Sequence, residues 1–596
     1  MSIYNAPLKD MQFVLRELAG LHEICALPGW EEVTPELVDQ VLGEASKFAR
    51  EVLDPLNRVG DQQGARFADG SVTAPAGYAE AYRGFVDGGW NSLTGDPRYG
   101  GQNLPHVVAI AVQEIWNSAN MAFCLAPMLT AGVVEAMKEH GTPEQQALYL
   151  PKLTLGDWAG TMNLTEPQAG SDLSAVRMQA VPHGDHYRLR GTKIFITWGE
   201  HDMSENIVHL VLARTPDAPE GVKGISLFIV PKFLVNPDGS LGARNDVKCV
   251  SIEHKMGIHA SPTCVLSYGE GEGALGYLVG KENRGLEYMF TMMNHARLGV
   301  GVEGVGIAER AYQHALDYAR TRVQGRAPGQ KSGDRVTIIH HPDVRRMLLT
   351  MKAQTEAMRA LAYVACAALD KARRHPDASE RRAGQALGDL LTPVVKGWST
   401  EQCVKVASIG VQVHGGMGFV EETGAAQYLR DARITTIYEG TTGIQANDLI
   451  GRKVAFEKGA TAFALISEMR KLSEPLKRLG SAWEAGRKNL DVAIDGLEAA
   501  THWLVDTYAQ DPARAAAVAV PYLELLGNVG GGWLMARAAV IAHERLQDPA
   551  ADRDFLFAKM ATARFYCEHL LPQAQGQADT VVSGAGSVLD LDDTLF

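Results

Sequence analysis

The sequence predicts an α+β protein in which a β domain follows one helical region and precedes two more. Its 596 residues are more than one hydrophobic core normally serves, so several packed domains are expected. Apolar residues recur at helical spacing before about residue 158 and again after about residue 280. Between these regions, short β-branched runs such as "HYRLRGTKIFIT" and "GISLFIVPK" are separated by Gly, Pro, Asp and Asn, which is typical of a mostly antiparallel β domain.

Changes in this pattern place the domain boundaries. Residues 1–35 form an N-terminal extension that ends in the turn-like "LPGWEEVTP". Thr34 and Pro35 predict a helix start, with Thr34 as the cap and Pro35 at the first helical position. We therefore expect a helical N-terminal domain over 36–158, a β domain over 159–280, a helical domain over 281–455 and an extra helical domain over 456–596.

Composition indicates a soluble, globular, cytoplasmic protein. Of its residues 46% are hydrophobic and 21% are charged, and no apolar run reaches the roughly 18 residues of a membrane span without polar interruption. The first residues, "MSIYNAPLKDMQFVL", carry Lys and Asp where a signal peptide has its apolar core. Seven scattered cysteines without a CxxC pair argue against disulfides and a zinc site, and no metal site is predicted.

Charge argues against nucleic acid as a partner. The formal net charge is −13 at pH 7, which disfavours nucleic acids and anionic membranes. The last segment, 456–596, holds 13 Lys and Arg against 19 Asp and Glu, unlike a DNA-binding tail. Local positive sites for an anionic ligand remain compatible with this total.

One apparent nucleotide-binding motif is set aside. Residues 299–304, "GVGVEG", match the GxGxxG fingerprint, which requires a strand before it and a helix opening at it. The preceding "LEYMFTMMNHAR" is helical in pattern. The glycines therefore indicate a close approach of two helices, and no Rossmann domain is predicted.

Four motifs occur in order along the chain. The loop "TEPQAGSD" (165–172) offers hydroxyls and backbone amides that suit a flavin edge or a phosphate, although alone it also fits an ordinary turn. It is followed by "KIFITWG" (193–199), "VQVHGGMGF" (411–419) and "YEGTTGIQ" (438–445). Together they make residues 36–455 resemble the acyl-CoA dehydrogenase family. That resemblance implies a helical N-terminal domain, a central antiparallel β domain and a C-terminal four-helix bundle, here with an extra C-terminal helical domain.

The resemblance implies FAD as cofactor and an acyl-CoA as substrate. Departures from the family pattern are Phe195 where Trp is common, "QGR" after Arg322, and Asn294 in place of Asp. A solvated positive face is the alternative for Arg322, which otherwise suits bidentate contact with the FAD pyrophosphate of a partner subunit. His341 matches the FAD surface less surely. The residues implied to bind the cofactor are Met162, Leu164, Thr165, Ser171, Phe195, Thr197, Arg322, Gln324, Gln412, Gly415, Gly416, Thr441 and Gly443, and those implied to bind the substrate are Ser171, Asn294, Arg297 and Gly440.

Glu439 is the candidate catalytic base. The α-proton of a thioester is a weak acid, so its removal needs a poorly solvated carboxylate and hydrogen bonds to the thioester oxygen. Ile437 and Tyr438 precede Glu439, and Gly440 lets a substrate approach the backbone. By resemblance, the Glu439 amide and an FAD ribityl hydroxyl bind the thioester oxygen. The alternative is a loop carboxylate paired with Arg430 or Arg433.

Some family members carry their base on an earlier helix. The corresponding position in this chain is Ala296, which cannot serve as a base. Glu439 is therefore the sole candidate at this site.

Both ends of the chain resemble an enlarged bacterial subgroup that includes 3-methylmercaptopropionyl-CoA dehydrogenases and broad-range fatty acyl-CoA dehydrogenases. The expected reaction is α,β-dehydrogenation of 3-methylmercaptopropionyl-CoA or a straight-chain acyl-CoA to the trans-2-enoyl-CoA. An electron-transfer flavoprotein is the expected acceptor, and a homodimer the expected assembly. The alternatives are an acyl-CoA oxidase that uses oxygen and a non-catalytic flavoprotein or nucleic-acid binder of the same fold.

Overall fold

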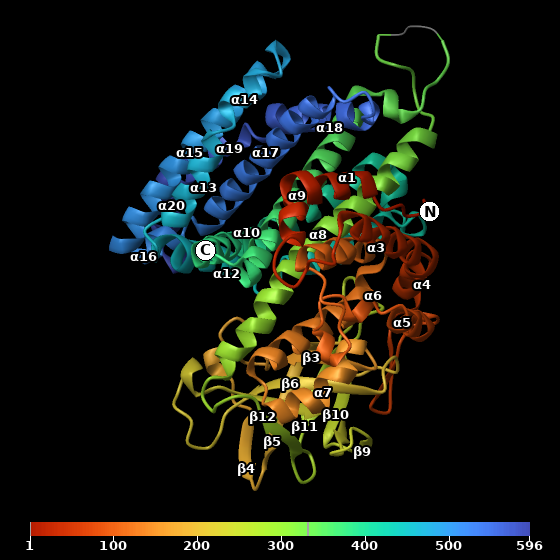
Figure 1. The fold of residues 1–596 in the computed structure, drawn as a ribbon, viewed down its shortest axis with the longest axis vertical. Helices are drawn as coiled ribbons and strands as arrows, with labels where there is room; N and C mark the ends of the chain where they lie inside the picture. The colour runs from red at the N-terminus through yellow and green to blue at the C-terminus, as the bar shows by residue number, and fades with distance from the viewer. Residues whose placement is uncertain (1, 330–332) are drawn as a thin grey trace. The chain divides into compact units, whose positions relative to one another are not determined.

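The computed structural model describes residues 2–329 and 333–596, which form two compact units (Figure 1). Unit 1 comprises the chain up to Ser46 together with Pro105–Ser118 and Val300–Phe596, and unit 2 comprises Lys47–Leu104 and Ala119–Gly299. Two long helices, α6 (His106–His140) and α8 (Gly285–Thr321), contribute residues to both units. Each unit is therefore assembled from segments that are distant in the sequence.

Unit 2 contains the predicted β domain. Its largest sheet has the strand order β10-β11-β5-β12-β7-β6-β3, and β4 pairs with β5. All pairs in this sheet are antiparallel except β3 with β6. The strands of the sheet are β3 (Trp158–Asn163), β4 (Gln179–His183), β5 (His186–Thr197), β6 (Asn206–Ala213), β7 (Ser226–Pro231), β10 (Val247–Ile252), β11 (Thr263–Tyr268) and β12 (Ala274–Leu278), and β8 (Phe233–Val235) pairs with β9 (Leu241–Arg244).

The helices that lie wholly within unit 2 come from the predicted N-terminal domain. They are α4 (Asp54–Gln63), α5 (Tyr78–Asp87) and α7 (Pro143–Leu155). A small hairpin of β1 (Arg66–Ala68) and β2 (Ser71–Thr73) interrupts the helical pattern. Its turn is formed by Asp69 and Gly70, both with positive φ, which is the geometry of a tight hairpin.

Unit 1 is helical. The predicted start of α3 is confirmed, because α3 begins at Pro35 and the hydroxyl of Thr34 accepts a hydrogen bond from Leu37 N at 3.2 Å. The helices of this unit outside α6 and α8 are α1 (Leu8–Phe13), α2 (Leu21–Cys25), α3 (Pro35–Phe48), α9 (Pro342–Arg374), α10 (Ala378–His414), α11 (Ala425–Thr435), α12 (Thr442–Asp448), α13 (Ala460–Arg470), α14 (Ser473–Lys477), α15 (Glu484–Gln510), α16 (Pro512–Ala516), α17 (Ala519–Arg545), α18 (Arg553–Phe565), α19 (Gln573–Ser583) and α20 (Ala585–Leu589).

The glycines of "GVGVEG" lie inside α8, as predicted, and they permit close packing on α10. A Cβ on Gly301 would lie 2.8 Å from the carbonyl oxygen of Val395, and a Cβ on Gly304 would lie 3.0 Å from that of Ser399. Larger residues at these positions would separate the two helices. The predicted α+β fold class, with helical domains before and after the β domain, is confirmed.

The extra C-terminal segment packs on the bundle through α17. This helix contacts both α9 and α10. A Cβ on Gly527 would lie only 2.2 Å from the indole of Trp398, and the indole Nε1 donates a hydrogen bond to Asn528 Oδ1 at 2.8 Å. The indole of α10 is thus held by one glycine and one amide of α17.

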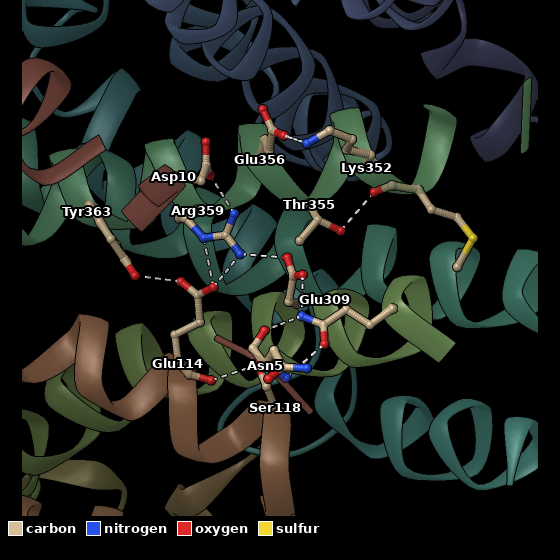
Figure 2. A network of polar contacts seen from close by, with 12 residues as sticks. Asn5, Asp10, Glu114, Ser118, Glu309, Lys352, Thr355, Glu356, Arg359 and Tyr363 are labelled. Carbon is tan, nitrogen blue, oxygen red and sulfur yellow. Dashed lines mark hydrogen bonds and ion pairs between the residues drawn. The ribbon is translucent and has the colours of Figure 1, made fainter. Parts of the chain in front are cut away.

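A buried charge network joins five segments of unit 1, and Figure 2 shows the part of it around Arg359. The Arg359 guanidinium of α9 binds Asp10 of α1 at 2.6 Å and Glu309 of α8 at 2.8 Å, and its Nε donates to Glu114 of α6 at 2.8 Å. Lys559 of α18 also binds Asp10, at 2.5 Å. All of these side chains are buried. The N-terminal extension and the extra C-terminal segment therefore share one set of ion pairs with the central helices.

Two helices are long and apolar enough to span a membrane, α6 and α17. In their most apolar windows, 94% and 89% of the residues are buried inside the protein. Such burial is typical of core helices. The seven cysteines are all buried and free of disulfides.

Candidate active site

Glu439 lies in the loop of residues 436–441, between α11 and α12 of unit 1. Its φ is +56°, a left-handed conformation that a non-glycine residue adopts only when its surroundings impose it, and the following Gly440 has φ +91°. Thr441 then caps α12, because its hydroxyl accepts a hydrogen bond from Ile444 N at 3.3 Å. The "EGTTG" sequence thus forms a tight turn that leads into a helix.

Two side chains hold the backbone of this turn. The ammonium of Lys396, which is fully buried in α10, donates to the carbonyl oxygen of Gly440 at 2.7 Å. The amide of Gln445, also fully buried, donates to the carbonyl oxygens of Glu439 at 3.1 Å and Gly440 at 3.3 Å. Neither residue was singled out from the sequence, because the contacts depend on how α10 and α12 pack.

A second carboxyl group lies next to the loop of residues 436–441, which holds the candidate base and is called the base loop below. The phenol of Tyr438 donates a hydrogen bond to Oε2 of Glu303 in α8. Burial raises the pKa of Glu303 to about 8, the Tyr438 hydrogen bond opposes this rise, and the charge of Glu439 adds to it. Glu303 is therefore largely neutral at pH 7. Its position within an otherwise apolar run, "GVGVEGVG", was the signal in the sequence that a buried polar contact existed.

The two arginines considered as alternative partners of Glu439 each contact a residue near the loop. Arg430 forms an ion pair with Glu421 at 3.0 Å. Arg433 donates a hydrogen bond to the hydroxyl of Thr436. In both cases, the arginine helps to order the segment around the base loop.

The turn expected to bind the dinucleotide follows the end of α10. Gln412 lies in its last turn, and Gly415, with φ +61°, terminates it. A Cβ at Gly415 or Gly416 would meet no other atom within 4 Å, so the backbone here is open to a ligand. The neighbouring His414 is buried and makes a hydrogen bond between Nδ1 and the carbonyl oxygen of Gly410 at 2.8 Å, as expected of a structural histidine.

Arg322 and Gln324 lie at the C-terminal end of α8, and both side chains are exposed. A backbone hydrogen bond from Ile338 N to Arg322 O at 2.8 Å fixes this segment. His341 Nε2 contacts the carbonyl oxygen of Gln324 at 2.7 Å, which gives this histidine a structural role. The exposed guanidinium fits either an anionic ligand or the solvated alternative.

In unit 2, the loop expected to contact the flavin is fixed by a buried ion pair. Lys193 of β5 donates to Leu164 O and to Glu166 Oε1, each at 2.8 Å. A backbone hydrogen bond from Ile194 N to Thr165 O at 3.0 Å joins the loop to the same strand. Met162 lies on β3, one residue before the strand ends. Lys193 and Glu166 were not identified as supporting residues, although the Glu lies within "TEPQAGSD".

Phe195 provides an apolar surface on β5. Its φ is +58°, and the residue is 59% exposed to solvent. Both its backbone conformation and its exposure are unusual for an aromatic residue. Thr197 ends the same strand. An exposed ring beside a hydroxyl suits an aromatic, hydrogen-bonding group such as a flavin, and Ser171 is also exposed.

Asn294 and Arg297 lie on the part of α8 that belongs to unit 2. Asn294 is exposed, whereas Arg297 is buried and its guanidinium lies 6.0 Å from the ring centroid of Phe290. Ala296 is buried between them. Within residues 2–329 and 333–596, no group of three or more His, Cys, Asp or Glu side chains is arranged to hold a metal ion.

Comparison with known families covers almost the whole chain. Residues 36–157, 161–269 and 283–454 match the N-terminal, middle and C-terminal domain models of acyl-CoA dehydrogenase. Residues 465–592 match a model described as acetyl-CoA dehydrogenase C-terminal like.

Two curated relatives match over nearly their full lengths. The 3-methylmercaptopropionyl-CoA dehydrogenase of Ruegeria pomeroyi is 49% identical over 98% of this chain and 99% of its own length. The broad-specificity linear acyl-CoA dehydrogenase FadE5 of Mycobacterium tuberculosis is 33% identical over 100% of both chains.

A solved structure shares the fold. The acyl-CoA dehydrogenase of Bacillus anthracis, complexed with FAD, aligns with a TM-score of 0.72 at 22% identity, over 96% of this chain and 91% of its own. The consecutive family matches and the full-length relatives show that this chain belongs to the acyl-CoA dehydrogenase family and is an FAD-dependent oxidoreductase acting on acyl-CoA thioesters.

Proposed function

We propose that Glu439 is the general base that removes the α-proton of the acyl-CoA. Bound FAD supplies the acceptor for the β-hydrogen, which leaves the substrate as hydride. The observation that carries this role is the enforced geometry of the base loop, in which Glu439 holds a positive φ between Tyr438 and Gly440. The carboxylate takes the proton at one of its oxygens, and Oε2 is shielded from solvent. Partial desolvation makes a carboxylate a stronger base, as the weakly acidic α-proton requires.

The cofactor-binding roles follow from the same resemblance and are supported by local geometry. The open backbone at Gly415 and Gly416 and the exposed ring of Phe195 suit a dinucleotide and a flavin, respectively. Thr441 and Gly443, which follow Glu439 in the same turn, are assigned to the flavin because the resemblance implies it. Met162, Leu164, Thr165, Ser171, Thr197, Arg322, Gln324 and Gln412 are assigned to FAD in the same way, and Ser171, Asn294, Arg297 and Gly440 to the substrate.

The preferred substrate is proposed to be 3-methylmercaptopropionyl-CoA. The relative of that name matches 98% of this chain at 49% identity, whereas the linear acyl-CoA dehydrogenase matches at 33%. A straight-chain acyl-CoA is the second candidate. The oxidase alternative has no support among these relatives, both of which are named dehydrogenases.

The test is anaerobic titration of the purified holoenzyme with acyl-CoAs from short to long chain and with 3-methylmercaptopropionyl-CoA. Bleaching of the flavin absorbance reports the dehydrogenation half-reaction, and 3-methylmercaptopropionyl-CoA should give the highest kcat/KM. Faster bleaching by a straight-chain substrate would reassign the preference. If no thioester bleaches the flavin absorbance, the proposed dehydrogenation is wrong.

The acceptor and the assembly are further parts of this proposal. An electron-transfer flavoprotein is proposed as the acceptor, which predicts that turnover in air without it yields little peroxide. A homodimer is proposed because the resemblance implies that Arg322 reaches the FAD of a partner subunit. Seven cysteines, none of them in a disulfide, support a reducing, cytoplasmic location. Sedimentation of the holoenzyme tests the assembly directly.

A further inference from the structure

We propose that Glu303 is a positioning residue for Glu439, and that it acts through the phenol of Tyr438. The inference rests on the proposed role of Glu439 as the base. Glu303 would anchor the side chain immediately before the base, while Lys396 and Gln445 anchor the backbone on and after it. The loop would then be held from α8 as well as from α10 and α12.

Glu303 is a buried carboxyl group in an otherwise apolar part of α8. Its side chain is fully buried among the valines and glycines of "GVGVEGVG". Oε2 accepts the Tyr438 hydrogen bond, and within the described part of the chain Oε1 has no hydrogen-bond partner. Burying a polar group in this way is costly, so the contact with Tyr438 has to compensate for it.

Tyr438 transmits this contact to the base because the two residues are adjacent. Glu439 occupies a left-handed conformation, which relaxes unless its neighbours restrain it. With its phenol held, Tyr438 cannot rotate its backbone freely. The peptide that joins Tyr438 to Glu439 is therefore restrained from one side, and the carbonyl oxygens of Glu439 and Gly440 from the other.

The charges around Glu303 also couple it to the base. Tyr438 and Glu439 face it from the base loop, and Lys396 and Cys403 face it from α10. With a pKa raised by burial to about 8, Glu303 is neutral at pH 7 and ionises in mildly alkaline solution. An ionised Glu303 destabilises the Glu439 carboxylate, which makes Glu439 a stronger base. The rate of flavin reduction should therefore rise as the pH passes through about 8.

The experiment uses rapid mixing of the holoenzyme with acyl-CoA under anaerobic conditions. Tyr438→Phe removes the donor, and Glu303→Leu removes the acceptor at similar volume. Each should slow flavin reduction by about 10- to 100-fold, because a misplaced reacting group costs about this much. The Kd for acyl-CoA and the FAD content should change by less than about twofold, since neither residue is assigned to binding.

Three comparisons separate positioning from a general structural role. Glu303→Gln keeps a neutral acceptor, so it should restore the pH 7 rate and lose the inflection near pH 8. The double variant E303L/Y438F should be no slower than either single variant, because both remove one interaction. Asp317→Asn, which removes an exposed carboxyl group on α8 outside the buried charge network, is the control and should keep the inflection.

Normal rates in both Tyr438→Phe and Glu303→Leu, or an inflection that persists in Glu303→Gln, would overturn the proposal. Glu439→Gln distinguishes this result from failure of the proposed function. If Glu439→Gln abolishes reduction while the Glu303 and Tyr438 variants behave as wild type, only the positioning role is lost. If Glu439→Gln retains reduction, the assignment of the base itself is wrong.

Discussion

Lys396 and Gly440 are joined by a hydrogen bond of 2.7 Å that brings a fully buried ammonium group to the residue directly after Glu439. A lysine without exposure is uncommon and is retained where its charge has a specific task. Here it fixes the carbonyl oxygen of the turn, and its positive charge also acts on Glu303. The base loop is therefore supported by the long helix α10, which is a rigid element.

Replacing Lys396 should impair the reaction more than it impairs FAD binding. Lys396→Met keeps the length of the side chain but removes the donor to Gly440. The rate of flavin reduction should fall by about 10- to 100-fold, with the holoenzyme still yellow after gel filtration. Lys405→Met is the matched control, because Lys405 is also on α10 but forms an exposed ion pair with Glu524. Equal rates for the two variants would contradict a role for Lys396 in the loop.

Glu439→Gln should bind FAD normally and lose flavin reduction by acyl-CoA. General base catalysis contributes roughly 10²- to 10⁴-fold, so a loss of at least this size is expected. The measurement is single-turnover bleaching with the best substrate. A near wild-type rate would remove Glu439 from the mechanism.

Arg322→Ala should weaken FAD retention. Arg322 is exposed at the end of α8, and in the proposed dimer its guanidinium binds the pyrophosphate of a partner subunit. The FAD-to-protein ratio after gel filtration should fall, and the population of dimers should fall with it. Arg346→Ala, which removes a surface ion pair with Asp343, should leave both unchanged. Unchanged occupancy in Arg322→Ala would favour the solvated alternative.

Arg359→Met should destabilise unit 1 strongly. The substitution removes the guanidinium that Glu114, Glu309 and Asp10 contact, although Asp10 keeps its ion pair with Lys559, and breaking a buried ion pair from one side costs about 3–5 kcal/mol. Thermal inactivation should occur at a clearly lower temperature. Arg470→Met, at an exposed pair with Asp495, is the control and should change stability by less than about 1 kcal/mol.

The contacts of Asp10 predict that the free energy of unfolding depends on pH in the acid range. Burial raises the pKa of Asp10, but the charges of Lys559 and Arg359 outweigh burial and hold this pKa below its ordinary value. The group therefore stabilises the folded state above its unfolded pKa, and this contribution is lost as the pH falls through the folded pKa. The difference in unfolding temperature between wild type and Asp10→Asn should be largest near neutral pH and should shrink in acid. A difference that stays constant down to acid pH would show that the charge of Asp10 is not involved.

Local sequence signals predicted much of the fold. Thr34 and Pro35 marked the start of α3, and "GISLFIVPK" marked β7. The hairpin of β1 and β2 was missed, although Asp69-Gly70 is a hairpin signal, because it lies within a long helical pattern. The parallel pairing of β3 with β6 was also not predicted, since side-chain alternation does not specify strand direction.

The base loop was predicted from the sequence, whereas the residues that hold it in place were not. "YEGTTG" drew attention to Glu439 because an acid, a glycine and capping threonines are adjacent in sequence. Lys396 and Glu303 lie 44 and 135 residues from their partners in the loop, and such contacts are set by the packing of α8 and α10. The small residues of "GVGVEG" showed that two helices approach closely, but not which helix would be the partner.

The ion pair between Asp10 and Lys559 joins residues 549 positions apart. During synthesis, Asp10 leaves the ribosome long before α18 exists, so the N-terminal extension cannot reach its final arrangement until α18 has been made. Until then, the chain is partly folded and the segment around Asp10 exposes apolar surface. Larger proteins commonly fold through partly folded intermediates of this kind. The native structure of unit 1 is thus completed only after α18 has been synthesised, and loss of either α1 or α18 would remove the same late step.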